Sequence, residues 1–194
     1  MSLELIIGCM YSGKSSELIR RVKRLQTIQQ SYLIYNSVID TRYGTSGIYT
    51  HNKNHIPCSV TDSLLPQVET ESFKGASTIF NDEAQFFSDL YEFVVVAVER
   101  HHKHVVVIGL DGDSDRQNFG QIHTLLPLAD DITKLKALCL KCADGSPGIF
   151  SKKVIHSTHS THSTHSTHST HSTNQVDIGS TDKYIAVCRK CYAS

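Results

Sequence analysis

The strongest constraint on the fold is the segment Gly8-Cys-Met-Tyr-Ser-Gly-Lys-Ser15, which satisfies the phosphate-loop pattern G-x-x-x-x-G-K-[ST]. Glycines let backbone amides curl around phosphate oxygens, and a helix that begins there points its positive end at them. In such a loop Lys14 reaches the terminal phosphates and the Ser15 hydroxyl ligates Mg²⁺. The pattern also occurs by chance, as a glycine-rich turn with an incidental lysine, so its context has to decide.

That context is a strand before the loop and a helix after it. Residues 3–7 form an apolar run. Residues 15–30 place apolar side chains at helical spacing, with a predicted buried stripe of Leu18, Val22, Leu25 and Ile28. A strand that leads into a phosphate loop and then a helix is typical of proteins that bind ATP or GTP. We therefore expect nucleotide binding here.

The rest of the first 138 residues continues to alternate strands and helices. The predicted strands lie at 32–35, 77–80, 105–108 and 132–140, and a second helix is predicted at 88–102. The run Val105-Val-Val-Ile108 has the composition of a strand that is covered on both faces. This alternation predicts an α/β domain at 1–138, a P-loop NTPase-like, mainly parallel sheet flanked by helices.

Acidic residues follow two of these strands. A phosphate loop needs an acidic partner for the metal, usually at the end of a neighbouring strand, and Asp82 has that position. The adjacent Glu83 is placed to accept a proton from a hydroxyl nucleophile. The triplet Asp40-Thr-Arg42 is a weaker candidate for phosphate and metal contacts. Taken alone, Asp82-Glu83 also fits a solvated acidic turn, and most Asp-x-Arg triplets are surface ion pairs.

Two C-x-x-C pairs near the C-terminus predict a metal site. Cys139, Cys142, Cys188 and Cys191 can supply the four thiolates of a closed, structural zinc site. Redox disulfides are the alternative, but neither pair lies in a thioredoxin-like context. We expect a small zinc-ribbon subdomain at 139–194. The remaining Cys9 and Cys58 are expected to be small buried or half-buried residues.

Six copies of His-Ser-Thr occupy residues 156–173, between the two cysteine pairs. The tract has no apolar residue and a period of three, so it cannot contribute to a core. A His-rich metal tract is one interpretation. A repeat expansion tolerated in a surface loop is the interpretation that we favour, because loop-closure entropy grows slowly with length.

Charge and hydropathy exclude some classes of partner. The chain has 19 Lys+Arg and 19 Asp+Glu, so bulk electrostatics do not favour nucleic acid or an anionic membrane as partners. It has no 18-residue apolar run, and its first residues carry no basic region before the apolar stretch. We therefore expect a cytoplasmic protein whose thiols are reduced.

Together these segments resemble the cytosolic, zinc-containing (type II) thymidine kinase family from about Leu5 to Tyr192. The matching motifs are Gly-Cys-Met-Tyr-Ser-Gly-Lys-Ser-Ser-Glu-Leu at 8–18, Asp-Thr-Arg-Tyr at 40–43, Asp-Glu-Ala-Gln-Phe-Phe at 82–87, Leu-Asp-Gly at 110–112 with Phe119-Gly120, Asp-Lys-Tyr at 182–184, and the final C-x-x-C. One departure is Ser114, where the family usually has an aromatic residue, and this leaves the accepted bases open. The repeat also lies inside the family's lasso loop.

The resemblance implies transfer of the γ-phosphoryl group of ATP to the 5′-hydroxyl of thymidine, with Glu83 as the general base. It implies magnesium ligation by Ser15, Asp82 and, through water, Asp40. The implied ATP site is Gly8, Cys9, Met10, Tyr11, Ser12, Gly13, Lys14, Ser15, Asp40, Thr41, Arg42, Asp82 and Gln85. The implied thymidine site is Met10, Phe86, Leu110, Phe119, Gln175, Val176, Asp177, Ile178, Gly179 and Tyr184.

The family resemblance further implies a homotetramer that thymidine triphosphate inhibits. Two rival functions remain open at this point. One is a P-loop ATPase whose zinc ribbon binds nucleic acid, and the other is a non-catalytic zinc module that only binds nucleotide. The chain lacks room for the second lobe of a helicase and has no net charge, which argues against the first. Retention of Asp82, Glu83 and Arg42 argues against the second.

Overall fold

The structure is a computed structural model that describes residues 1–40, 47–49, 55–154 and 183–194. Its centre is a six-stranded sheet in which every pair of neighbouring strands is parallel. In spatial order the strands are β5 (Ser59–Thr61), β2 (Tyr32–Ser37), β6 (Thr78–Asn81), β7 (His104–Gly109), β1 (Ser2–Gly8) and β8 (Asp131–Leu135). The predicted α/β class and parallel sheet are confirmed.

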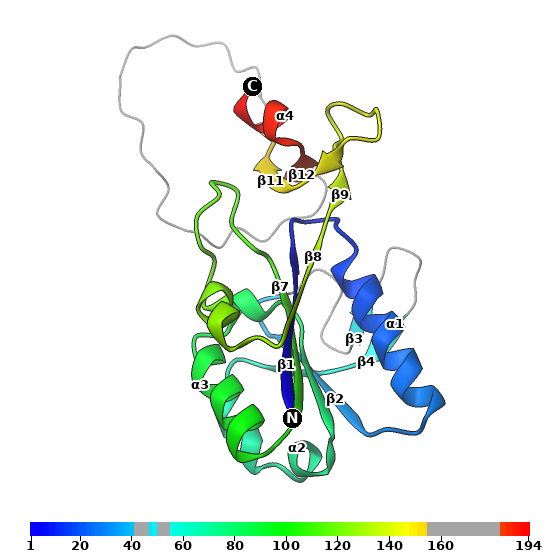
Figure 1. Cartoon of the computed structure of the whole chain (residues 1–194), viewed down its shortest axis with the longest axis vertical. Coiled ribbons are helices and arrows are strands. Elements are labelled where there is room, and N and C mark those ends of the chain that lie inside the picture. Colours follow the sequence, from blue (N-terminus) through cyan, green and yellow to red (C-terminus); the bar gives the residue numbers. More distant parts are fainter. Residues whose placement is uncertain (41–46, 50–54, 155–182) are drawn as a thin grey trace.

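Helices cover both faces of this sheet (Figure 1). On one face lies α1 (Lys14–Thr27), and on the other lie α2 (Glu71–Gly75) and α3 (Leu90–Val95), which continues as a π-helical turn, η3 (Val96–Arg100). Three 3₁₀ turns complete the second layer: η1 (Leu65–Glu69), η2 (Ala84–Phe86) and η4 (Ile122–Leu128). Because side chains alternate along a strand, Val106 and Ile108 pack toward α1 while Val105 and Val107 pack toward α3.

The first helix differs from its prediction at its C-terminal end. Leu18 and Val22 are buried as predicted, but Ile28 is 64% exposed and lies outside the helix. The helix ends because the next residue, Gln29, has a left-handed backbone with φ 55°. The prediction that Ile28 extends the buried stripe is therefore wrong.

The strand order corrects one detail of the sequence argument. Asp82 was expected at the end of a strand adjacent to residues 3–7, but β7 lies between β1 and β6. Since all six strands are parallel, their carboxyl ends meet at one edge of the sheet. Asp82 therefore still reaches the edge at which the phosphate loop begins.

A small subdomain lies beyond that edge (Figure 1). It is made of β9 (Ala137–Leu138) paired with β10 (Pro147–Gly148), β11 (Phe150–Lys153) paired with β12 (Tyr184–Val187), and α4 (Arg189–Ala193). The predicted strand 132–140 is divided between β8 and β9. Because β9 pairs with β10, the pairing within this subdomain begins just before the expected boundary at 138/139.

A separate hairpin, β3 (Gly47–Tyr49) with β4 (His55–Pro57), was not predicted, nor was the short edge strand β5. Three-residue strands carry too few positions for a periodic pattern. No helix in the described ranges has the length and apolar character needed to cross a bilayer.

Candidate active site and metal centre

The phosphate loop connects β1 to α1 as predicted. Gly13 caps the helix with a left-handed φ of 88°, and a Cβ atom at Gly8 would collide with the carbonyl oxygen of Leu135. Lys14 is buried, and its Nζ donates to the carbonyl oxygens of Gly8 (3.2 Å) and Cys9 (2.8 Å). The lysine is therefore held inside the curve of the loop.

Charges around Lys14 come from three carboxylates. Burial lowers the pKa of the ammonium group, and the negative charges of Glu83, Asp82 and Asp111 act in the opposite direction. The Ser12 hydroxyl oxygen is buried without a hydrogen-bond partner among the described residues. A cation inside a loop with an unsatisfied hydroxyl group is suited to phosphate oxygens.

Asp82 and Asp40 lie at the same edge, after β6 and β2. Asp82 is only 4% exposed, and its backbone N–H donates to the carbonyl oxygen of Tyr35 (2.8 Å). The pKa of Asp82 is raised to about 7, mainly by burial and next by the charge of Glu83, with a smaller rise from Asp40, while Lys14 acts in the opposite direction. The Asp40 carboxylate accepts a hydrogen bond from Asn36 Nδ2 (3.4 Å). A buried carboxylate that is costly to ionise is suited to a cation that would offset its charge.

Glu83 is oriented by a neighbouring amide that sequence reasoning assigned to the nucleotide. Gln85 Nε2 donates to Glu83 Oε2 at 2.6 Å, and Gln85 Oε1 accepts from the backbone N–H of Leu110 at 3.1 Å. Gln85 is 3% exposed, and Glu83 has a left-handed φ of 48°. Gln85 thus links the carboxylate after β6 to the end of β7. Only the tertiary structure could identify this bridge.

Three apolar residues of the expected thymidine site are linked to one another or to Gln85. The rings of Phe86 and Phe119 meet edge to face with centroids 5.5 Å apart, and Leu110 is tied to Gln85. Met10, Phe86, Leu110 and Phe119 are all half-buried, whereas Tyr184 is buried. Four of the expected base-contacting residues therefore keep some exposed surface.

Several predicted site residues lie outside the described residues. They are Thr41, Arg42 and the lasso segment Gln175, Val176, Asp177, Ile178 and Gly179, together with the repeat at 156–173.

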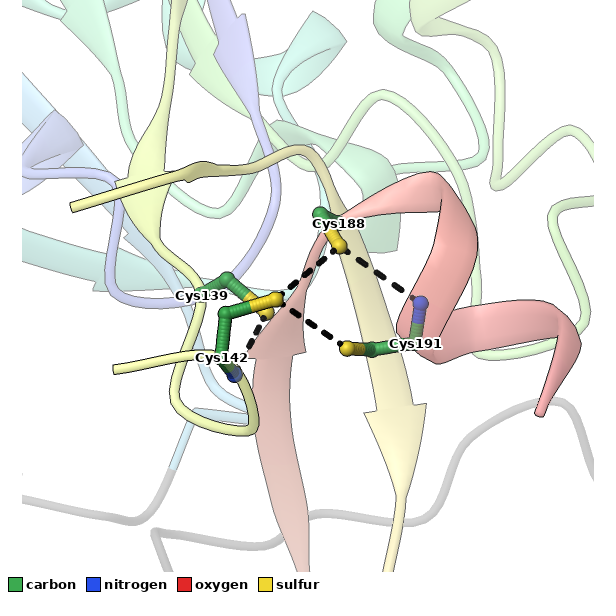
Figure 2. Close-up of side chains that lie close together, drawn as sticks. All are labelled: Cys139, Cys142, Cys188 and Cys191. Carbon is green, nitrogen blue, oxygen red and sulfur yellow. Dashed lines mark hydrogen bonds between the residues drawn. The ribbon is translucent and has the colours of Figure 1, made fainter. Parts of the chain in front are cut away.

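The four predicted zinc ligands come together in the subdomain (Figure 2). Their Sγ atoms all lie within 4.8 Å of one another, and Cys142 Sγ is 3.6 Å from Cys188 Sγ and 3.3 Å from Cys191 Sγ. A zinc ion with bonds of about 2.3 Å to four tetrahedral thiolates would separate the sulfurs by about 3.8 Å. The cluster fits that ion.

Backbone N–H groups support the cluster. The N–H of Cys142 donates to Cys139 Sγ (3.4 Å), and that of Cys191 donates to Cys188 Sγ (3.5 Å). Although burial opposes ionisation of Cys139, backbone donors from Cys142 and Cys188 lower its pKa to about 6. The thiolate is the form that binds metal.

The phosphate loop touches the cysteine subdomain directly, which sequence reasoning missed. Cys9 Sγ donates to the carbonyl oxygen of Gly148 (3.3 Å), and the Met10 N–H donates to Ser151 Oγ (3.0 Å). Cys9 is buried and Cys58 half-buried, as predicted. The only sequence signal for this interface was the small size of Cys9.

A further ion pair at this edge was also missed. Lys134 Nζ in β8 lies 2.6 Å from Asp111 Oδ2, just after β7. Asp111 belongs to the Leu-Asp-Gly motif, and its position directly after a buried strand was the available signal.

Comparisons with known proteins agree with this arrangement. A family model described as thymidine kinase matches residues 1–192. Similar proteins include a thymidine kinase of Fowlpox virus (strain NVSL), 38% identical with 100% of this chain and 97% of that relative covered. A thymidine kinase of Vaccinia virus (strain Western Reserve) is 38% identical over 98% of this chain and 96% of its own length. One of Oryza sativa subsp. japonica is 35% identical, over 98% of this chain and 65% of its own length.

Proposed function

Because this chain belongs to the thymidine kinase family, we propose that it transfers the γ-phosphoryl group of ATP to the 5′-hydroxyl of thymidine. The observation that carries the proposal is the meeting of Lys14, Asp82 and Glu83 at one edge of the parallel sheet. There the Lys14 ammonium group can bind phosphate, and the buried Asp82 carboxylate can bind a metal ion. The half-buried Glu83 carboxylate can accept the proton of the acceptor hydroxyl.

These positions support the following reaction. The loop at 8–15 holds the phosphates of ATP, with Lys14 at the β- and γ-phosphates. Ser15, Asp82 and Asp40 would hold Mg²⁺, which when bound neutralises charge on the phosphates. Glu83 accepts the proton of the 5′-hydroxyl while that oxygen forms a bond to the γ-phosphorus and the bond to the β-phosphate oxygen breaks. The products are thymidine monophosphate and ADP. By the family resemblance alone, Arg42 would contact the phosphates.

The nucleoside would lie beside Glu83. Phe86, Leu110 and Phe119 would offer apolar surface to the base, and the family resemblance adds Met10 and Tyr184 to the proposed site. Backbone groups of residues 175–179 would bind its edge. This pocket suits an uncharged base, because fixed amide and carbonyl groups match its donor and acceptors.

The four cysteines would hold a structural zinc ion. The set is closed, with four protein thiolates, so it leaves no open position for catalysis. We further propose a cytosolic homotetramer that thymidine triphosphate inhibits, on the basis of the family alone.

Phosphoryl transfer from labelled ATP to a panel of nucleosides tests the proposal. We expect thymidine to be phosphorylated, and the Glu83→Gln variant to lose turnover by about 10²–10⁴-fold while it still binds ATP. Near-normal turnover in Glu83→Gln would refute its role as the base. Hydrolysis of ATP that single-stranded DNA stimulates, without transfer to any nucleoside, would support the rival ATPase.

A further inference from the structure

The loop at 111–118 joins two residues of the proposed nucleoside site. It starts after Leu110 and ends before Phe119. Within it, Asp113 Oδ1 accepts the N–H groups of Asp115 (2.9 Å) and Gln117 (2.8 Å), and the Asp113 N–H donates to the carbonyl oxygen of Gln117 (3.0 Å). The loop is therefore a compact turn held together by its own hydrogen bonds, and its outside contacts help to fix its position.

Asp111, at the start of the loop, pairs with Lys134 of β8. Two other outside contacts of the loop go to the cysteine subdomain. The guanidinium carbon of Arg116 lies 4.2 Å from the ring centroid of Tyr192 and 5.6 Å from that of Phe150. The Tyr192 hydroxyl donates to the carbonyl oxygen of Ser114 at 2.6 Å. The two rings pack edge to face with centroids 5.3 Å apart. We call Arg116, Phe150 and Tyr192 the aromatic clamp.

Arg116 has a backbone conformation that an arginine rarely adopts. Its φ is 61°, in the left-handed region, which a residue with a Cβ atom occupies only when its surroundings hold it there. The cation–π contacts with Tyr192 and Phe150 supply such a restraint.

The aromatic clamp is linked to the cysteine cluster through the backbone of Cys191 and Tyr192 and through hydrogen bonds from a lysine. Tyr192 directly follows Cys191, one of the four thiols. Lys152 Nζ donates to the carbonyl oxygens of Cys191 (3.2 Å) and Tyr192 (2.9 Å). The position of the Tyr192 ring is thus set by the same backbone that presents Cys191.

We propose that Arg116 and Tyr192 are positioning residues through which the cysteine subdomain places the loop at 111–118, and with it the nucleoside-facing residues Leu110 and Phe119. This inference rests on the proposed function for its effect on thymidine, but the docking of the loop is independent of it. The aromatic clamp positions the loop that flanks the proposed nucleoside site. The contacts of Cys9 and Met10 with the subdomain instead hold the phosphate loop.

The test compares Tyr192→Phe and Arg116→Gln with a matched control, Arg189→Gln. Arg189 also stacks on Phe150, at 5.0 Å, but within the described residues it makes no hydrogen bond, ion pair or ring contact with the loop. Tyr192→Phe keeps the ring and removes only the hydroxyl. Arg116→Lys serves as the conservative variant, because it keeps the positive charge.

We expect Tyr192→Phe and Arg116→Gln each to raise KM for thymidine about fivefold, which corresponds to one hydrogen bond or cation–π pair of about 1 kcal/mol. KM for ATP and the zinc content should stay unchanged. Arg116→Lys should recover part of the loss, and Arg189→Gln should behave like the original chain. Hydrogen exchange of the loop amides at 113–117 should become faster in the first two variants, whether or not thymidine is the substrate.

Unchanged exchange at 113–117 in both variants would overturn the docking and hence the inference. Faster exchange with an unchanged KM for thymidine would overturn its effect on the substrate. Equal effects in Arg189→Gln and Arg116→Gln would show that the subdomain as a whole is perturbed, which also contradicts the inference. Failure to phosphorylate thymidine in the original chain would instead overturn the proposed function, and the exchange data would still test the docking.

Discussion

Replacing Gln85 by methionine removes the bridge between Glu83 and Leu110 while keeping a side chain of similar length. In the original chain Gln85 Nε2 lies 2.6 Å from Glu83 Oε2, and Gln85 Oε1 lies 3.1 Å from the Leu110 nitrogen. The side chain is 3% exposed, so water cannot replace both partners without local rearrangement. Gln85→Met therefore tests whether this amide orients the proposed base.

The size of the effect follows from the two hydrogen bonds. A hydrogen bond to a charged group contributes about 1.5–3 kcal/mol, and its loss would misorient the Glu83 carboxylate. If that energy appears in the transition state, kcat falls by about 10–150-fold, since each factor of ten corresponds to about 1.36 kcal/mol. Loss of the part-buried hydrogen bond to the Leu110 N–H lowers the free energy of unfolding by about 0.5–1.5 kcal/mol.

The assay measures kcat and both KM values, together with ATP affinity by calorimetry and unfolding by urea. Gln121→Met is the matched control, because Gln121 also uses both amide atoms, with Ser88 O (2.7 Å) and the Tyr91 nitrogen (2.8 Å), at the start of α3. It should lose stability but keep kcat. If Gln85→Met weakens ATP binding tenfold with normal kcat, Gln85 contacts the nucleotide and the reasoning is refuted.

Two further predictions concern Asp82 and the cysteine cluster. With a pKa of about 7 against an ordinary 3.8, folded Asp82 holds its proton where the unfolded chain has lost it, so without metal the free energy of unfolding falls as pH rises from about 4 to 7. Asp82→Asn should remove this fall, so its free energy of unfolding at pH 8 should be a few kcal/mol higher, at about 1.4 kcal/mol per pKa unit. The variant should also lose activity. Equal urea midpoints for the two proteins at pH 8 would contradict this prediction. Metal analysis should find one zinc ion per chain, and Cys142→Ser should lower both zinc content and Tm while Cys58→Ser preserves them. An unchanged zinc content in Cys142→Ser would exclude the cluster as the site.

The sequence was sufficient for features that neighbouring residues encode together. The phosphate loop, the apolar runs that became β1 and β7, the helix after the loop and the two C-x-x-C pairs are all confirmed as structural elements. Each element, and each C-x-x-C pair taken singly, depends on spacing within about a dozen positions, where strand and helix periods and turn residues act locally. Asp82 and Glu83 were identified by their position after the predicted strand at 77–80 and by the Asp-Glu-Ala-Gln-Phe-Phe motif at 82–87.

Tertiary structure decided what joins residues that are distant in the chain. The insertion of β7 between β1 and β6 is one such feature. Another is the Tyr192–Ser114 hydrogen bond, 78 positions apart, and a third is the Met10–Ser151 contact, 141 positions apart. Gln85 is only two residues from Glu83, yet its second partner, Leu110, lies just after the end of β7. Such contacts form only when distant elements pack together, and no local sequence pattern encodes that packing. Closing the long intervening chain costs conformational entropy, and only the burial of the assembled core offsets this cost.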